Sequence, residues 1–424
     1  MARNLSWTFG SQLFVSIFAI ITLFITARAL GPAGLGMLAL VEAFVRLVDL
    51  FLRLEPWQAV MRYGIQAQHR GDDHAFLRLV KLSIIIDAAG GILAGIVCML
   101  LAGLIAPMIG LSPDEGPKYI YLFAFGLFFS FRPTAAAVLR ILDRFDILAR
   151  VDMASALIRL FLTLFAWQGG FGVWAFLVIL LIHSLLDGLL AFAFALKELH
   201  KRHHTGLLMA SGLKALRENH GFLRFLWNAN VNVILRQSAN RFDIIVLGIM
   251  MDPAAVGIYQ LGKRIMNRIM KLAGPVRQTI YPELSRLWEE GRQTQFIRLI
   301  MIMSAGMFGL QLVIVLPFML HMDSVVEVVF GPEFAGAGPV MNILLFSAII
   351  YASGVALNPA LLSMGLDRKL VRITIMSTLL FAVSFLPMVH MFDVGGAAIS
   401  NLVFNLTWTI GCSWVLYRTR RSKS

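Results

Sequence analysis

Ionisable side chains recur at helical spacing inside one of the chain's apolar runs. Glu42, Arg46, Asp49 and Arg53 lie in the run 37–54, and at about 100° per residue they share one face of a helix. The pairs Glu42–Arg46 and Asp49–Arg53 have i,i+4 spacing and can form ion pairs within that helix. The stripe can also line a water-accessible cavity, because self-pairing does not make it suitable for facing lipid. We favour cavity lining.

A second run, 256–281, is more strongly basic. Gln260, Lys263, Arg264, Asn267 and Lys271 lie on one face, with Arg268 at its margin and almost no acid nearby. An interfacial helix whose lysines extend toward water is the alternative, and it suits Lys271. It suits Lys263 and Arg264 less, because they lie only two turns from the preceding loop. We therefore expect Lys263, Arg264 and Asn267 to face a cavity.

Further polar residues interrupt the remaining apolar runs. The run 222–250 carries a first polar face, and Asn230, Gln237 and Arg241 lie on a second one. Arg132 precedes Pro133, which would loosen its helix. His183 and Asp187 lie one turn apart, so they form either a proton relay or a structural hydrogen bond. Arg159 suits an ion pair within the bundle as well as it suits a substrate contact. The first polar face of the run 222–250 comprises Asn228, Asn232, Arg236, Asn240 and Asp243.

A cavity rich in arginine and lysine favours an anion, because guanidinium groups bind phosphate oxygens bidentately and stay charged in a low dielectric. The predicted substrate contacts are Arg46, Arg53, Arg132, Asn232, Arg236, Lys263, Arg264 and Asn267. The candidates for ion coupling are Glu42, Asp49, Asp187 and Asp243.

No metal or cofactor is expected. The two cysteines, Cys98 and Cys412, lie apart in apolar runs, which argues against a disulfide framework or a metal cluster. His200, His203 and His204 have no acidic cluster beside them, so a solvated basic connector explains them better than a metal site.

Composition identifies the setting of these residues. The chain has 424 residues, 58% hydrophobic and 14% charged, with a mean hydropathy of +0.78, whereas soluble domains carry about 25% charged residues. Backbone groups in lipid must be satisfied internally, so we predict an all-α polytopic membrane protein. The net charge of +13 lies mostly in loops, where it acts as a topology signal rather than as a nucleic-acid surface.

About twelve runs are long enough to span a bilayer. Loops rich in arginine and lysine alternate with acidic loops, so the positive-inside rule places both termini in the cytoplasm. The predicted spans are 7–29, 37–54, 82–109, 119–142, 147–167, 173–196, 222–250, 256–281, 296–320, 340–362, 371–389 and 397–417.

The two halves of the chain repeat. Gly31-Pro32-Ala33 and Asp252-Pro253-Ala254 each follow a span, about 221 positions apart, and Gly71, Leu142-Asp143-Arg144 and Gly169 recur later at nearly the same offset. Each half holds six spans, which makes a parallel repeat of two six-helix lobes with substrate between them. The predicted organisation is a lobe over 1–197, a basic cytoplasmic linker over 198–221 and a second lobe over 222–424.

Several motifs resemble the polysaccharide flippase family of the multidrug/oligosaccharidyl-lipid/polysaccharide exporter superfamily. They are the segments 29–36, 256–259 and 330–337, together with the polar run ending Arg241-Phe242-Asp243. The resemblance implies alternating access in the bacterial inner membrane and export of undecaprenyl-pyrophosphate-linked sugar units for O-antigen, exopolysaccharide or capsule. It also implies membrane lipid and polysaccharide polymerase machinery as partners. The family's basic residue on the first helix is absent, because no charge precedes Arg28 within that span.

Two other functions are compatible with parts of this sequence. A multidrug antiporter of the same superfamily would favour acidic cavity residues, and Asp49, Asp187 and Asp243 keep that alternative open. A membrane polymerase or ligase would be expected to present a large external loop, but the longest one, near 321–338, is short. With no nucleophile–base pair and no phosphate-binding glycine loop, we expect a transporter and not an enzyme.

Overall fold

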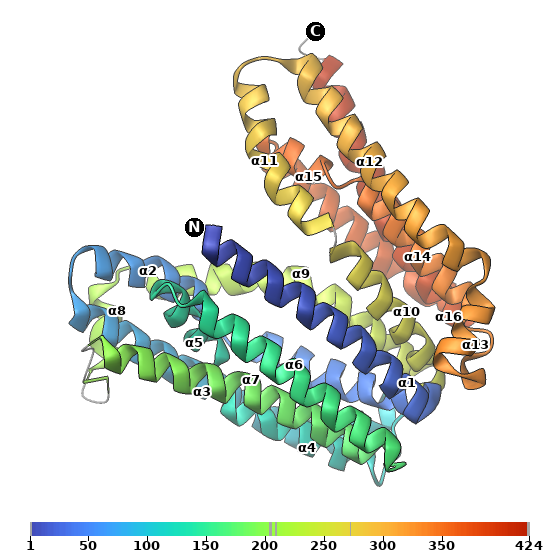
Figure 1. Cartoon of the computed structure of the whole chain (residues 1–424), viewed down its shortest axis with the longest axis horizontal. Helices are drawn as coiled ribbons and strands as arrows, with labels where there is room; N and C mark the ends of the chain where they lie inside the picture. The colour runs from blue at the N-terminus through green and yellow to red at the C-terminus, as the bar shows by residue number, and fades with distance from the viewer. Residues whose placement is uncertain (1, 203–205, 208–209, 272, 422–424) are drawn as a thin grey trace. The chain divides into compact units, whose positions relative to one another are not determined.

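The computed structural model describes residues 2–202, 206–207, 210–271 and 273–421. Over these residues the chain folds into helices without a β-strand (Figure 1). The predicted all-α membrane fold is thus confirmed, as expected where lipid leaves no other partner for backbone groups. The linker residues His203 and His204 lie outside the described part of the chain.

Seven segments of the described chain are long and apolar enough to cross a membrane. Two of them hold 43 and 53 residues, about twice what one crossing needs. The count of twelve crossings stays a prediction. The segments are Gly10–Leu52, Asp73–Met108, Gly116–Ile141, Val173–Lys201, Gln293–Leu320, Gly338–Ser363 and Asp367–Thr419.

The chain divides into two compact units, and the first consists of residues 1–30 and 37–253. Its helices α3, α5, α6 and α7 share a core that includes Phe76, Leu139, Leu142 and Ala191. The elements of this unit are α1 (Ala2–Leu52), α2 (Trp57–His69), α3 (Asp73–Met108), α4 (Gly116–Phe125), the 3-10 helix η1 (Gly126–Phe129), α5 (Arg132–Ile141), α6 (Phe145–Gln168), α7 (Val173–Lys201), α8 (Gly212–Glu218) and α9 (Phe222–Met250).

The second unit consists of residues 31–36 and 254–424. Helices α12, α14 and α16 lie side by side in it (Figure 1), and a core around Leu284, Phe296, Leu361 and Trp408 joins α11, α12, α15 and α16. Its elements are α10 (Pro253–Lys271), α11 (Ala273–Glu289), α12 (Gln293–Leu320), α13 (Met322–Phe330), the 3-10 helix η2 (Pro332–Phe334), α14 (Gly338–Ser353), α15 (Leu357–Ser363) and α16 (Asp367–Arg421).

Two predicted pairs of spans are each two helices that meet at a kink within one labelled element. The runs 7–29 and 37–54 form the two parts of α1, which meet at Gly31 with φ 63° and ψ −175°. Glycine tolerates this conformation because it has no Cβ. The last two predicted spans are likewise joined in α16, where Phe392 and Asp393 leave the helical conformation.

Other predicted spans are interrupted. The run 119–142 is divided among α4, η1 and α5, and the run 340–362 between α14 and α15. The run 256–281 is helical on both sides of residue 272, which lies outside the described residues. Helix α10 covers Pro253–Lys271 and α11 begins at Ala273, so one helix over this run stays a prediction. Helix α2, which the sequence analysis did not expect, follows α1 in the first unit.

Backbone geometry supports the repeat at two turns. Gly71 and Gly291 have φ of 68° and 70°, and in each turn the glycine N–H bonds to the carbonyl three residues back. Asp143 (φ 58°) matches Gly365 (φ 69°) in the same way, at an offset of 222. The sequence match of Asp143 with Asp367 was therefore two residues out of register, because only the turn position requires a positive φ.

Helix α9 packs within the first unit, although the repeat places it at the start of the second half. The predicted lobe boundaries at 197 and 222 stay a prediction. The predicted linker is partly helical, since α7 continues to Lys201 and α8 covers Gly212–Glu218.

Candidate functional site

The charged stripe predicted on 37–54 lies in the second part of α1. Asp49 and Arg53 are buried, while Glu42 and Arg46 are half-buried. The Arg53 Nη2 atom lies 2.7 Å from Asp49 Oδ2, so the predicted i,i+4 pair forms. Arg53 Nη1 also donates to the carbonyl and hydroxyl oxygens of Ser130, which follows η1. Both ends of the Arg53 guanidinium are therefore occupied within the first unit.

Arg46 lies over an aromatic ring. Its Cζ atom is 5.6 Å from the centroid of Phe123 on α4, within the range of a cation–π interaction. Half-buried and held by a ring rather than a carboxylate, Arg46 keeps its donors available for an anion better than Arg53 does.

Arg132, the first residue of α5, bridges two other helices. Its Nη2 atom lies 2.7 Å from Asp152 Oδ1 on α6, and its Nη1 atom pairs with Asp187 Oδ1 on α7. Its side chain remains 35% exposed. The spacing of His183 and Asp187 had predicted that these two residues pair, and Asp152 was not among the predicted site residues. An acid seven residues before Arg159 in an apolar helix was the signal that could have identified it.

His183 lies among charges of both signs. Arg159, Arg132 and Glu42 are its electrostatic neighbours, and its Nδ1 atom makes no hydrogen bond to any described residue. Because Arg132 occupies Asp187, the His183–Asp187 relay is not the arrangement that this structure shows.

Helix α9 adds polar groups to the same unit. Arg241 is half-buried and lies within electrostatic range of Glu42, Arg46 and Asp49. Asn230 accepts a hydrogen bond from the backbone N–H of Glu55 at 2.8 Å, which ties α9 to the end of α1. Asp243 is buried, and its Oδ1 atom accepts from the N–H of Ile244.

The side chains of Asn232 and Arg236 lie outside the described part of the structure, so their predicted role stays a prediction. The predicted site residues of the first unit whose side chains are described form a network of mixed charge, and not a purely basic surface. Arg53 and Arg132 each have carboxylate partners, so binding of an anion by either requires an ion pair to open.

Helix α10 in the second unit is different, because Pro253–Lys271 contains no acidic residue. Lys263 is buried with 3% exposure, Gln260 is buried and Arg264 is half-buried, whereas Asn267 and Lys271 are exposed. Lys263 Nζ lies 5.6 Å from the centroid of Tyr259.

Two glycines allow α10 to pack closely within its unit. A Cβ at Gly257 would collide with the carbonyl oxygen of Pro32, and one at Gly262 would lie 2.7 Å from Leu344 Cδ1. The helix that carries Lys263 and Arg264 is thereby held rigidly against its neighbours.

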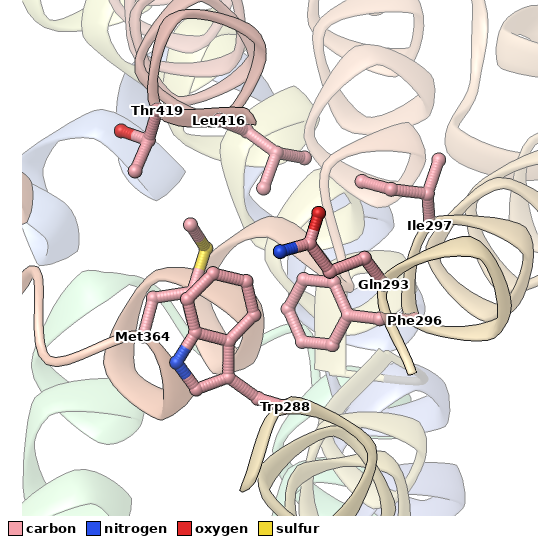
Figure 2. Close-up of a pocket in the computed structure, with 7 residues that line it drawn as sticks. All are labelled: Trp288, Gln293, Phe296, Ile297, Met364, Leu416 and Thr419. Carbon is pink, nitrogen blue, oxygen red and sulfur yellow. The ribbon is translucent and has the colours of Figure 1, made fainter. Parts of the chain in front are cut away.

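A small pocket also lies in the second unit among α11, α12 and α16 (Figure 2). Its lining is largely apolar and contains none of the predicted site residues, so it does not serve anion binding. The residues around it are Trp288, Gln293, Phe296, Ile297, Met364, Leu416 and Thr419.

Comparisons with known proteins give the relationships of the chain. A family model described as "Polysaccharide biosynthesis protein" matches residues 1–288. The chain is 23% identical over 335 residues to the inner membrane protein YghQ of Escherichia coli strain K12, which covers 79% of this chain and 94% of that protein. It is 25% identical over 162 residues to the probable low-salt glycan biosynthesis flippase Agl15 of Haloferax volcanii, covering 38% of this chain and 34% of that one.

Solved structures share the fold. An inward-facing multidrug resistance MATE family transporter of the MOP superfamily superimposes with a TM-score of 0.76 at 14% identity, covering 96% of this chain and 95% of the transporter. The lipid II flippase MurJ in an inward closed conformation gives 0.70 at 11% identity, covering 98% and 88%. At these identities the likeness establishes the fold alone.

Proposed function

Because the chain belongs to the polysaccharide biosynthesis protein family, we propose that it is a flippase that moves undecaprenyl-pyrophosphate-linked oligosaccharide units across the bacterial inner membrane. The two halves would expose the substrate alternately to each side. The family match and the flippase among its relatives support transport rather than catalysis.

The observation that carries the substrate class is the acid-free helix α10. This helix contributes positive charge to the second unit without any acidic residue of its own. Lys263 is 3% exposed and Arg264 half-buried, in a segment where no acid is available on the same helix. A diphosphate supplies negative charge and several acceptor oxygens, which match an ammonium and a guanidinium group.

We assign Arg46, Lys263, Arg264 and Asn267 to the headgroup, with Asn232 and Arg236 retained as predicted contacts. Arg53 and Arg132 would join only if their ion pairs opened during transport. Glu42, Asp49, Asp187 and Asp243 stay candidates for ion coupling, and the cytoplasmic location of both termini stays a prediction from loop charge. Membrane lipid and the polysaccharide polymerase machinery are the other proposed partners.

The test is flipping of a labelled lipid-linked oligosaccharide in proteoliposomes that contain the purified chain. Lys263→Ala and Arg264→Ala are each expected to reduce flipping at least tenfold, equivalent to about 1.4 kcal/mol of lost headgroup interaction. Lys271→Ala is the matched control, because it removes the same charge from an exposed position on the same helix. Wild-type rates in both variants, with normal melting temperatures, would disprove the assignment.

A multidrug antiporter is the second candidate. The carboxylates Asp152 and Asp187 in the first unit favour it, since a cationic drug would require negative charge in the cavity. Both acids are held by Arg132, which lowers the negative charge available. Efflux of a fluorescent cationic dye that competes with the lipid-linked sugar would establish this function in place of the first.

A further inference from the structure

The interruption of the fourth predicted span creates a buried polar site that the headgroup proposal does not use. Helix α4 ends at Phe125, η1 ends at Phe129 and α5 begins at Arg132, so the break lies within an apolar segment. Discontinuous membrane helices expose backbone groups that need other partners, and such breaks commonly bind ions in transporters.

Two glycines of α3 pack against the residues at the break between α4 and α5. A Cβ at Gly91 would collide with the carbonyl oxygen of Leu127 in η1, and one at Gly90 would lie 2.7 Å from Cγ of Arg53. The backbone of η1 and the stem of Arg53 therefore both rest against α3, one helical turn from Asp87. All of these residues belong to the first unit.

Asp87 and Arg53 hold the two sides of the break. Arg53 donates to the Ser130 carbonyl at 3.2 Å, on the side where η1 ends. On the other side, the N–H of Thr134 in the first turn of α5 donates to Asp87 Oδ2 at 3.1 Å. A carboxyl at the start of a helix satisfies one of the free N–H groups there.

Two buried oxygen atoms at this point approach each other without a well-formed hydrogen bond. Asp87 and Thr134 are each 1% exposed, and neither Asp87 Oδ1 nor Thr134 Oγ1 makes a hydrogen bond of good geometry to any described residue. Unsatisfied buried polar atoms are rare and indicate a missing ligand or a functional group.

The negative charge of an ionised Asp87 would also be only partly compensated by nearby cations. The charged groups facing it are Arg53 and Glu55, and Arg53 is already paired with Asp49 at 2.7 Å. Asp49, Glu55 and Asp87 all lie within electrostatic range of Arg53, and Asp49 and Glu55 are also within range of Arg241. Asp49, which was a candidate for ion coupling, has a cationic partner within hydrogen-bond distance, whereas Asp87 has its closest described contact with a backbone N–H.

We propose that Asp87 is a proton-binding carboxyl that holds the break in α4–η1–α5, and that release of this proton loosens the α3–α5 contact during transport. The protonated form would donate from Oδ1 to Thr134 Oγ1 while Oδ2 accepts from the Thr134 N–H, which leaves no buried charge. A proton fits better than a metal cation, because hard cations need about six oxygen ligands, and among the described residues Asp87 and Thr134 together offer two unsatisfied side-chain oxygens. The role in transport rests on the proposed flippase function, whereas proton binding does not.

The first experiment needs no substrate. Infrared difference spectra of the purified full chain in nanodiscs, recorded over a pH series, should contain a protonated-carboxyl band that is lost in Asp87→Asn and retained in Asp114→Asn. Asp114 is the matched control because it is an exposed loop carboxyl. Thr134→Val removes the acceptor of the proposed O–H bond, and it should lower the band's midpoint by about 1 pH unit, the equivalent of one hydrogen bond.

A band that persists in Asp87→Asn would overturn the proposal, as would a band in the wild type that responds to sodium at fixed pH. If Asp87→Asn does not fold, an unchanged midpoint in Thr134→Val would equally overturn it.

The second experiment measures flipping against pH. Asp87→Asn should remove the pH dependence and Asp87→Glu should shift it, while a purely structural cap predicts the wild-type profile in Asp87→Asn. A titrating band without flipping of lipid-linked sugar would reject the proposed substrate and leave the proton site standing. Flipping with an unchanged pH profile in Asp87→Asn would reject the coupling role.

Discussion

Arg53 offers a direct test of whether an intramembrane arginine stabilises the fold or binds substrate. Its guanidinium lies 2.7 Å from Asp49 and also bonds to Ser130, and the two charged side chains are 6% and 7% exposed. Arg53→Ala would leave the Asp49 carboxylate buried without its partner. Breaking a buried ion pair in this way costs about 3–5 kcal/mol of unfolding free energy, because the remaining charge is no longer compensated.

The Asp49–Arg53 ion pair can also be tested by a double-mutant cycle. Replacing both partners, as in Asp49→Ala combined with Arg53→Met, removes both charges at once and should recover at least about 2 kcal/mol relative to Arg53→Ala. Unfolding of the purified chain in mixed micelles with a rising fraction of denaturing detergent measures these differences. Arg28→Ala, which removes an exposed arginine from the same helix, should change stability by less than about 0.5 kcal/mol. If Arg53→Ala has the unfolding free energy of the wild type but no longer flips lipid-linked sugar, Arg53 is a substrate contact. Its assignment as a residue that stabilises the fold is then wrong.

Two further changes test packing and charge. Gly257→Ala should lower unfolding free energy by about 1–3 kcal/mol, because its Cβ would collide with the Pro32 carbonyl; Gly10→Ala, facing open space, is the control, and equal melting temperatures for the two would contradict this packing. The Arg144 guanidinium, hydrogen-bonded to Asp146 outside the predicted spans, holds the pKa of that carboxyl below its usual range. The contribution of the ionised Asp146 to the free energy of unfolding is therefore present above about pH 4 and is lost as pH falls through the folded-state pKa. Between about pH 4 and pH 2, the melting temperature of Asp146→Asn should therefore fall less than that of the wild type.

Local patterns in the chain predicted local structure. The apolar runs correspond to helices, and the i,i+4 spacing of Asp49 and Arg53 correctly predicted an ion pair, because both residues lie on one turn of one helix. The glycine at 71 and its counterpart at 291 were matched by sequence alone and adopt the same turn. In each case the physical cause lies within a few residues of the pattern.

Partners from distant parts of the chain were not predictable in the same way. Sequence proximity suggested His183 for Asp187, but Asp187 pairs with Arg132, which is 55 positions away. Asp87 is an acid inside an apolar run, but its contact with Thr134 depends on a break in another part of the chain.

By itself, the amino-acid sequence determined that this chain is a multi-pass helical membrane protein with a repeated plan, because hydropathy and backbone satisfaction depend on composition and short-range order. Tertiary structure decided which intramembrane charges neutralise one another and which lie beside rings or backbone. That choice depends on which helices pack together, and packing brings Arg132 to Asp152 and Asp187, and Thr134 to Asp87, across separations that no local pattern encodes.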